Sequence, residues 1–434
     1  MNQYKRIICA LGLTVLSLTM VAQSGTNSPY SQYGLGVMAE QGQGFNRGMN
    51  GLSYGLHQRN QVNAQNPASY ANVDSLTFIF DAGVSIQNTN FEENGIKMNA
   101  KNSDFEYVVA SFRLARNLGV SFGLLPYSNV GYNYYTSKYL NSTNSTYYTS
   151  TYAGSGGLHQ AYIGLGYRFF DKLSLGANIS YLWGNYYKSV VTNFSDNNIK
   201  TIGKYYTADV TSYKIDLGAQ YDIRLDKENT LTVGAVFGLG HKLGDVANCR
   251  IISNNSSTTV SDTTLYPKNG GLSLSIPNSF GVGVAYTHNN KWTVGADYSL
   301  QKWGNEKFPM MFNSDAGTYY ILQNVLKDRH KIILGGEYVP DELSRSFFNR
   351  VHYRFGVSYT TPYIKVDNQD GPKEYSVSAG FGIPIINTYN NRSLLNISGQ
   401  WVRSSAKNLI TENYFRINIG ITFNERWFMK WKVE

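Results

Sequence analysis

Hydrophobic and polar residues alternate strictly near the end of the chain. The segment Phe415–Phe423 reads FRINIGITF, with phenylalanine or isoleucine at every second position and arginine, asparagine, glycine or threonine between them. This period of two is that of a β-strand with one apolar and one polar face. The pattern recurs along most of the chain in segments of about ten residues, which is typical of a transmembrane β-barrel with apolar residues toward lipid and polar or small residues toward the lumen.

Period-two segments separated by glycine, asparagine, aspartate and proline predict about fourteen strands. They lie near residues 75–87, 104–116, 118–134, 158–169, 172–188, 205–224, 229–241, 277–288, 291–302, 329–339, 349–361, 374–384, 392–404 and 413–424. The predicted fold is an all-β membrane protein, a closed antiparallel transmembrane β-barrel.

The predicted connections alternate between tight turns and long polar loops. Tight turns fall at Asn117, Phe170–Asp171, Leu225–Glu228 and Asn289–Asn290, and long loops near residues 135–157, 189–204, 242–276 and 303–328. A soluble β-sandwich can also alternate apolar and polar residues, because one face of each sheet packs on a core. Outer-membrane barrels have short periplasmic turns and long external loops. The rhythm therefore favours the barrel over a sandwich or a propeller, and it predicts that both chain ends are periplasmic.

Residues 1–22 have the layout of a cleaved secretory signal. Lys5 and Arg6 precede an apolar run, and small residues follow up to Ala22. Cys9 sits near the start of the run, whereas a lipoprotein signal has its cysteine at the end. We therefore expect export through a cleaved signal peptide to the outer membrane of a Gram-negative bacterium.

Composition and charge narrow the function further. After the signal there is no run of about twenty apolar residues that could form a transmembrane helix. The formal net charge is +9, but the lysines and arginines are scattered, so neither nucleic-acid binding nor a polybasic membrane patch is indicated. Removal of the signal leaves Cys249 alone, so no internal disulfide is expected.

Residues 23–74 precede the first predicted strand and contain repeated glycines with little periodicity. One interpretation is a free periplasmic tail. The other is a plug, because a barrel of about fourteen strands has a lumen wide enough for water and glycines let a chain bend tightly inside it. We predict a signal at 1–22, an N-terminal hatch at 23–74, the barrel at 75–424 and a periplasmic tail at 425–434.

Four segments are distinctive in their order and spacing. They are SQYGLGVM at Ser31–Met38, NPA at Asn66–Ala68, LLPYSNVGY at Leu124–Tyr132, and SIPNSFGVGVAY with KWTVGADYSLQKW within Ser275–Trp303. Together they resemble the FadL-type outer-membrane transporters of long-chain fatty acids and other hydrophobic compounds. The resemblance implies a fourteen-stranded barrel with an N-terminal hatch inside it and a kink in the third strand that opens a gap in the wall.

In this sequence, the resemblance implies that Asn66, Pro67 and Ala68 form the hatch element and that Pro126 forms the kink of the third strand. Proline lacks the N–H that a β-ladder needs, so in a closed barrel it should leave an unpaired carbonyl or a bulge on the neighbouring strand. A gap in the wall and a harmless bulge near a turn are both compatible with this proline.

Other polar residues give weaker signals. His352 and Arg354 share the inward parity of the eleventh strand and could bind an anionic head group, or they could pair with inward acids such as Glu337. Ser358 faces the same side as His352, but about 20 Å further along at about 3.3 Å per residue, so no catalytic set is indicated. Gly34–Ala39 matches G-x-G-x-x-A without a βαβ context, and the histidines lack zinc-binding spacing. We expect neither an enzyme nor a bound cofactor or metal.

We hypothesise a channel for passive uptake of hydrophobic or amphipathic small molecules such as long-chain fatty acids, with lateral exit through the kinked third strand. Its partners would be membrane lipids and hydrophobic cargo, with no nucleic acid. Burying the cargo contributes about 0.8 kcal/mol per methylene, so release into lipid avoids returning it to water. The alternative is a non-transporting barrel subunit of an outer-membrane protein-secretion machine, whose partners would be secretion-system proteins.

Overall fold

The computed structural model describes residues 25–426 apart from residues 57, 141–145, 255–260, 267–271, 313–317, 367 and 386–392. The predicted signal peptide lies outside the described residues. So does the predicted tail, except that its first two residues, 425 and 426, belong to the last strand. No helix in the described part is long and apolar enough to cross a membrane.

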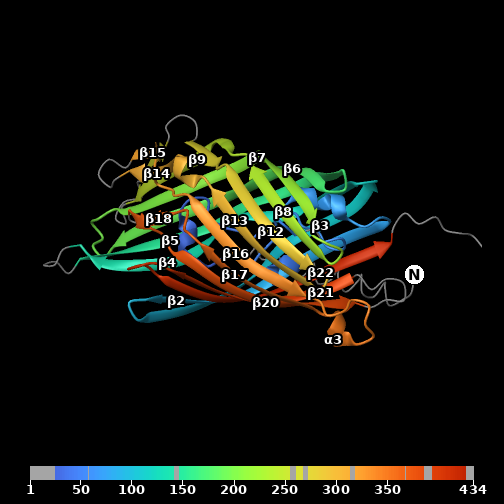
Figure 1. Ribbon diagram of the computed structural model, residues 1–434. Helices are drawn as coiled ribbons and strands as arrows, with labels where there is room; N and C mark the ends of the chain where they lie inside the picture. The colour runs from blue at the N-terminus through green and yellow to red at the C-terminus, as the bar shows by residue number, and fades with distance from the viewer. Residues whose placement is uncertain are drawn as a thin grey trace, which may run out of the picture.

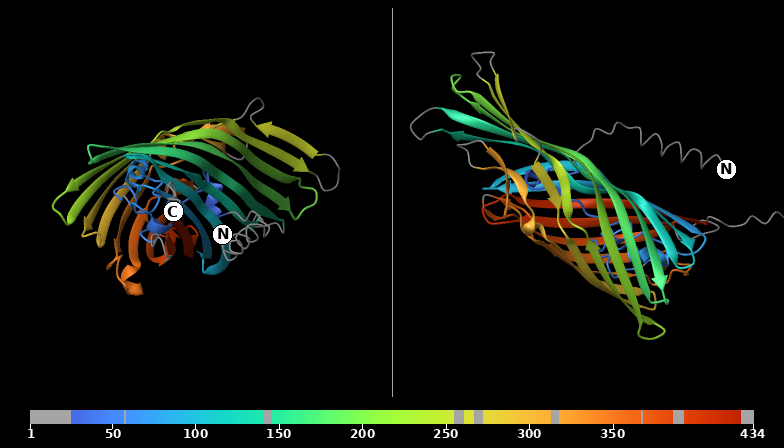
Figure 2. Two further views of the ribbon diagram at one scale, coloured as in Figure 1. Left: turned by 90° about the vertical axis from the view of Figure 1, so that its right-hand side faces the viewer. Right: turned by 90° about the horizontal axis from the view of Figure 1, so that it is seen from above.

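Fourteen antiparallel strands form a closed ring (Figures 1 and 2). In wall order they are β2 (Thr77–Glu93), β3 (Ile96–Ala115), β4 (Leu118–Tyr139), β5 (Tyr147–Phe169), β6 (Leu173–Phe194), β7 (Thr201–Arg224), β8 (Asn229–Gly238), β12 (Ser279–His288), β13 (Trp292–Gln301), β16 (Arg329–Tyr338), β17 (His352–Thr360), β20 (Lys373–Ile385), β21 (Ser393–Ser405) and β22 (Thr411–Arg426). Each pairs with its neighbours, and β22 pairs with β2 to close the ring. The prediction of a closed fourteen-stranded barrel is confirmed.

Side chains alternate between the two faces of the wall as the sequence pattern predicts. In β22, Phe415 and Phe423 are exposed on the outside, whereas Asn418 and Thr422 are buried. The hydrocarbon of the membrane covers the outward phenylalanines, whereas the buried polar side chains face the filled lumen. Apart from the outer halves of β3 and β4, the backbone N–H and C=O groups are paired between neighbouring strands, as a wall inside a bilayer requires.

Three of the segments predicted as long loops are largely strand, and this correction changes the outer shape. Strands β4–β7 contain 22 to 24 residues each, whereas about 9–11 residues cross a membrane. The parts of these strands that extend beyond the membrane form a sheet with three further strands. These are β9 (His241–Asn254), β10 (Ser261–Tyr266) and β11 (Leu272–Ile276). Serine, threonine and asparagine suggested loops, but pairing between neighbouring strands satisfies the backbone whatever the side chains, and threonine and tyrosine suit strands.

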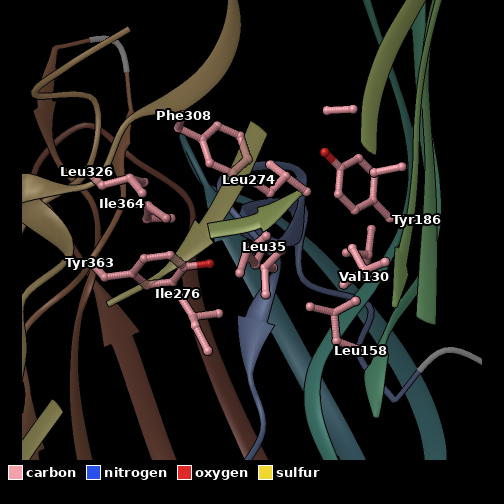
Figure 3. Close-up of a cluster of buried hydrophobic side chains, with 14 of the residues drawn as sticks. Leu35, Val130, Leu158, Tyr186, Leu274, Ile276, Phe308, Leu326, Tyr363 and Ile364 are labelled. Atoms are coloured by element: carbon pink, nitrogen blue, oxygen red, sulfur yellow. The ribbon is translucent and has the colours of Figure 1, made fainter. Parts of the chain in front are cut away.

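The half of the lumen under the long connections, which the sequence predicts to be external, is closed by a buried apolar cluster (Figure 3). Its members include Leu35, Val130, Leu158, Tyr186, Leu274, Ile276, Phe308, Leu326, Tyr363 and Ile364. They come from the wall, from the N-terminal segment and from external connections that carry η3 (Trp303–Asn305), β14 (Phe308–Phe312), β15 (Thr318–Leu322), β18 (Lys365–Val366) and β19 (Gln369–Asp370). Removing this apolar surface from water stabilises the closed mouth.

Among the described residues, the connections at the opposite end are tight turns, with one exception. Asn117, Asn289 and Asn290 have positive φ in these turns, a conformation that asparagine tolerates better than most residues. The exception is the connection 339–351 between β16 and β17, which contains the short helix α3 (Phe347–Arg350). In Figure 1, α3 lies outside the wall beside this rim.

Candidate functional site

The N-terminal segment, residues 25–74, lies inside the barrel (Figure 2, left). It contains η1 (Pro29–Gln32), β1 (Val37–Met38), α2 (Gly44–Arg47) and η2 (Pro67–Asn72). Most of its residues are buried, including Phe45, Met49 and Leu52, which form a cluster with Ile333 of the wall. The segment predicted as a hatch is therefore packed as part of the protein interior.

Asn66, Pro67 and Ala68 begin η2 close to the wall. Asn66 caps the helix, because its Oδ1 accepts a hydrogen bond from the Ala68 N–H at 3.1 Å, while its Nδ2 donates to the Tyr54 carbonyl at 2.8 Å. Proline follows at the first helical position, where its missing N–H costs nothing. The wall facing η2 is lined by Gly119, Gly166, Gly176 and Gly218, where any Cβ would overlap with η2 or its cap. These glycines let the two backbones approach closely.

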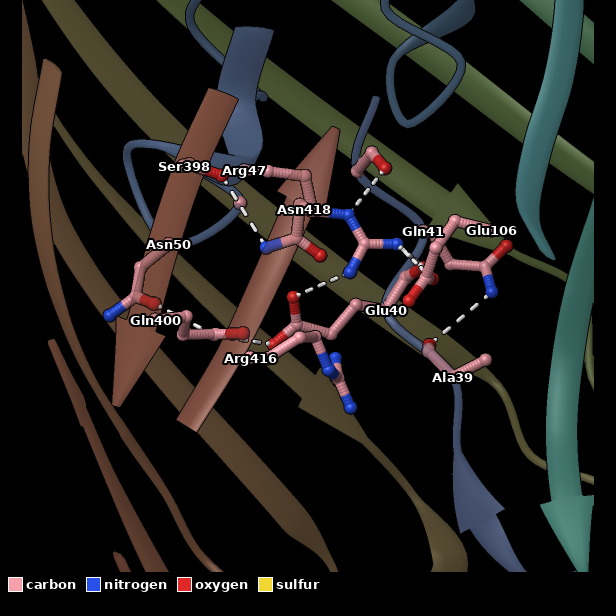
Figure 4. Close-up of polar contacts among 12 residues, drawn as sticks. Ala39, Glu40, Gln41, Arg47, Asn50, Glu106, Ser398, Gln400, Arg416 and Asn418 are labelled. Atoms are coloured by element: carbon pink, nitrogen blue, oxygen red, sulfur yellow. Dashed lines mark hydrogen bonds and ion pairs between the residues drawn. The ribbon is translucent and has the colours of Figure 1, made fainter. Parts of the chain in front are cut away.

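Arg47 of α2 is the centre of a buried ion-pair network (Figure 4). Its Nη2 contacts Oε2 of Glu106 on β3 at 2.7 Å, and its Nη1 contacts Oε2 of Glu40 at 3.0 Å. The Nε atom donates to the Gly42 carbonyl at 2.8 Å. The arginine side chain is only 1% exposed, so the two carboxylates compensate its charge where water cannot.

Glu40 also connects this network to β21, three strands away from β3 along the wall. Gln400 of β21 donates from Nε2 to Glu40 Oε1 at 3.0 Å and to Asn50 Oδ1 at 2.9 Å. Burial opposes ionisation of Glu40, but Lys331, Arg47 and Arg416 outweigh it and lower the pKa to about 2. The carboxylate therefore stays charged, and through Arg47 and Gln400 it helps to hold the N-terminal segment to β3 and β21.

This pKa predicts loosening of the N-terminal segment in acid. A carboxyl whose pKa is lowered in the folded state contributes stability above its ordinary pKa of 4.5, and that contribution is lost as the pH falls toward 2. We expect protease cleavage within residues 25–74 to increase over this interval when the detergent-solubilised barrel is titrated with an acid-stable protease. In Glu40→Gln this acid-dependent increase should be much smaller, and an identical pH profile in both proteins would contradict the assignment.

The wall has a gap between the outer halves of β3 and β4. Their ladder ends where Val108 faces Leu124, although both strands continue outward, β3 paired with β2 and β4 paired with β5. Phe105 and Leu124 beside this point are exposed on the outside. The gap therefore begins at the edge of the apolar outer surface.

The N-terminal segment occupies this gap from both sides. On the β4 side, β1 pairs antiparallel with the strand edge, and Val37 lies opposite Asn129. On the β3 side, Asn102 donates from Nδ2 to the Gly25 carbonyl at 2.9 Å. The segment thus pairs with the backbone of β4 where β3 would otherwise do so, and it contacts β3 through the Asn102 side chain.

Pro126 lies at the lower end of the gap. The β4–β5 register shifts between Pro126 and Ser128, which is a bulge at Tyr127. The Pro126 carbonyl accepts a hydrogen bond from Gln41 Nε2 at 2.5 Å, and the Tyr127 carbonyl accepts one from the Ala39 N–H at 3.1 Å. Carbonyls of β4 beside the end of the β3–β4 ladder are therefore satisfied by the N-terminal segment.

Two lumen cavities, of about 110 Å³ and about 180 Å³, lie beside the same stretch of the N-terminal segment. Both are lined by Met38–Glu40 and by Arg329 and Lys331 of β16. Within the described residues, neither basic side chain makes a hydrogen bond or an ion pair with the protein. Glu40 lines both cavities as well and offsets one of these two positive charges, so the pair of cations favours one further negatively charged group there.

The sequence pattern does not distinguish Arg329 or Lys331 from other polar residues of the wall. The available signal was their parity, which is that of the buried Ile333 and Glu337 on the same strand. Arg47 and Glu40 gave no signal, because the N-terminal segment has no periodicity from which a facing partner could be deduced.

The structure places His352 and Arg354 together but engages both with Glu337. Arg354 Nε contacts Glu337 Oε2 at 2.5 Å, and His352 Nδ1 lies 3.2 Å from the same oxygen. Arg354 also donates from Nη1 to Asn396 Oδ1 at 2.6 Å. This pairing is the alternative that the sequence left open for these residues. Among the described residues there is no group of histidine, cysteine and acidic side chains that could hold a metal ion.

Solved structures of a FadL homologue and of toluene transporters share this fold. A Pseudomonas aeruginosa FadL homologue matches with a TM-score of 0.63 at 13% identity, covering 89% of this chain and 99% of that chain. The Ralstonia pickettii toluene transporter TbuX matches with a TM-score of 0.58 at 14% identity, covering 89% of this chain and 99% of that chain. The Pseudomonas putida toluene transporter TodX matches with a TM-score of 0.58 at 15% identity, and the match covers 91% of this chain and 100% of that chain. No match is found among curated proteins.

The fold thus defines a FadL-like outer-membrane β-barrel with its N-terminal segment inside the lumen, and the resemblance seen in the sequence is confirmed at the level of the fold. The family model described as BamG matches residues 4–434. The chain belongs to the BamG family.

Proposed function

We propose that this barrel is a channel for passive uptake of amphipathic small molecules that carry an anionic group, such as long-chain fatty acids, with lateral exit between β3 and β4. The observation that carries the proposal is the wall gap above Val108 and Leu124. It is filled by a segment that is held there by a few hydrogen bonds and a two-residue strand. Displacing that segment opens a path from the lumen to the apolar outer surface.

The charges of the lumen support a cargo with one ionised end. Arg329 and Lys331 face both cavities with Glu40 beside them. In the larger cavity Lys214 pairs with Asp216, which leaves one positive charge in excess there for a carboxylate or phosphate. The apolar part of the cargo would leave through the gap beside Phe105 and Leu124. Lateral release keeps that part out of water, which favours this route over one through the periplasm.

A disulfide across the gap tests the route. Val37 and Asn129 face each other in the ladder, so Val37→Cys with Asn129→Cys, made in Cys249→Ser, should lock the N-terminal segment in place. We expect uptake of a labelled fatty acid by cells to fall about tenfold or more when oxidised and to recover after reduction, because gating segments must move. A matched lock between Thr287 and Thr293, which are paired near a periplasmic turn, should have no effect.

A second candidate function is favoured by the filled lumen. The apolar cluster closes the external mouth, and the two cavities beside Met38–Glu40 are small for a long-chain amphiphile. These observations suit a non-transporting barrel subunit of an outer-membrane protein-secretion machine. Strands β4–β7 extend well beyond a membrane thickness and would give such a subunit a large external surface.

The same lock distinguishes the two functions. If locked cells take up fatty acid normally, the lateral route is wrong. If depletion of the protein also causes secreted or outer-membrane proteins to accumulate in the periplasm while uptake is unchanged, the subunit function is supported instead.

A further inference from the structure

We propose that the connection 339–351, with its helix α3, inserts into the periplasmic leaflet of the outer membrane and binds phospholipid there. It is the one long connection at the periplasmic rim within the described residues. It does not contribute to the lumen or to the wall gap, so the proposal is independent of the transport function.

The apolar side chains of this connection are unusually exposed. Leu343 is 94% exposed, Phe348 70% and Phe347 45%. Leaving three large apolar side chains together in water is unfavourable, and such groups usually mark a membrane or protein contact. The connection is not loose, because the Asp341 N–H donates to the Asn349 carbonyl at 2.8 Å and closes it on itself.

The neighbouring wall indicates that lipid covers these side chains. An aromatic girdle runs along the periplasmic rim, where Trp292 stacks on Tyr338 at 4.0 Å between ring centroids and Tyr353 meets Phe381 at 5.9 Å. Aromatic girdles lie at the membrane–water interface. The Tyr353 hydroxyl donates to the Phe348 carbonyl at 3.1 Å, which joins α3 to the girdle. In Figure 2 (left), α3 projects outward from the wall rather than over the lumen.

The charges of the connection are arranged for a phospholipid head group. Arg345 and Arg350 flank the two phenylalanines, whereas Asp341 and Glu342 precede them. When aromatic rings insert into the acyl region of a leaflet, arginines next to them can reach the lipid phosphates. Asp341 lies beside Asn349, the residue before Arg350, and its carboxylate accepts a hydrogen bond from the Leu343 N–H at 3.0 Å.

Depth-dependent quenching tests the proposal in the intact barrel. Phe348→Cys and, separately, Leu343→Cys are made in Cys249→Ser, labelled with the fluorophore NBD and reconstituted in vesicles of phosphatidylethanolamine and phosphatidylglycerol. Lys227→Cys, on the exposed turn between β7 and β8, serves as the aqueous control, and Ile419→Cys on the outer wall as the lipid control. Heat-modifiable gel mobility verifies that each barrel is folded.

We expect phospholipids with a spin label high on the acyl chain to quench the probes at positions 348 and 343 about fivefold more strongly than the probe at position 227. Quenching equal to that at position 227 would overturn the proposal. So would a probe that becomes shielded only when solubilised outer-membrane proteins are added, because the surface would then bind a protein rather than lipid.

Discussion

Arg47→Ala is expected to release the N-terminal segment and turn a closed barrel into a conducting one. The substitution leaves the buried Glu106 and the partly buried Glu40 charged and without the arginine that contacts both. Breaking a buried ion pair by removing one partner typically costs about 3–5 kcal/mol. That is a large part of what holds a segment of some fifty residues against the wall, so the segment should leave the lumen for much of the time.

Single-channel conductance in planar bilayers measures this release directly. The native barrel should show rare openings, and Arg47→Ala frequent or permanent ones. Arg116→Ala removes an arginine from an exposed periplasmic turn and should behave like the native protein. If Arg47→Ala stays closed and equally resistant to protease, the ion-pair network does not hold the segment.

Glu337→Gln should destabilise the barrel wall by a similar amount. Glu337 is the acid that contacts both Arg354 and His352, and the arginine side chain is only 1% exposed. Without the carboxylate a buried guanidinium loses its counter-charge, at a cost of about 3–5 kcal/mol. Urea unfolding of the barrel in lipid vesicles, followed by gel mobility, gives the change in the free energy of unfolding.

The double variant Glu337→Gln with Arg354→Met separates structure from ligand binding. Removing both charges should restore most of the stability, because no uncompensated ion remains. If the pair is structural, fatty-acid uptake recovers together with stability. If Arg354 instead binds the anionic end of the cargo, stability returns while uptake stays low, and the ligand role considered from the sequence would be supported.

The wall strands could be predicted because each carries its own signal. The parity of FRINIGITF in β22 follows from which side chains meet lipid, and that requirement is local to the strand. The outer extensions of β4–β7 were missed because they leave the membrane, where neither face must be apolar. There only the pairing partner decides whether a segment such as 147–157 is strand or loop.

The site was less predictable, because it depends on contacts between distant parts of the chain. Pro126 could be identified from the missing N–H of proline, but the hydrogen bond from Gln41 to its carbonyl has no signature in either segment. His352 and Arg354 share a parity with each other, yet only the register of β16 against β17, in which Glu337 faces Arg354, selects pairing over ligand binding.

The sequence by itself determined a membrane-spanning antiparallel barrel and the number of strands in its wall. Every wall strand has lipid on one face and the lumen on the other, so each strand shows the same alternation of apolar and polar residues. Only the tertiary structure decided that residues 25–74 fill the lumen, that they occupy the gap between β3 and β4, and that Arg329 and Lys331 face the cavities. An aperiodic segment acquires its contacts from the surfaces that surround it, and those surfaces exist only after the barrel has closed.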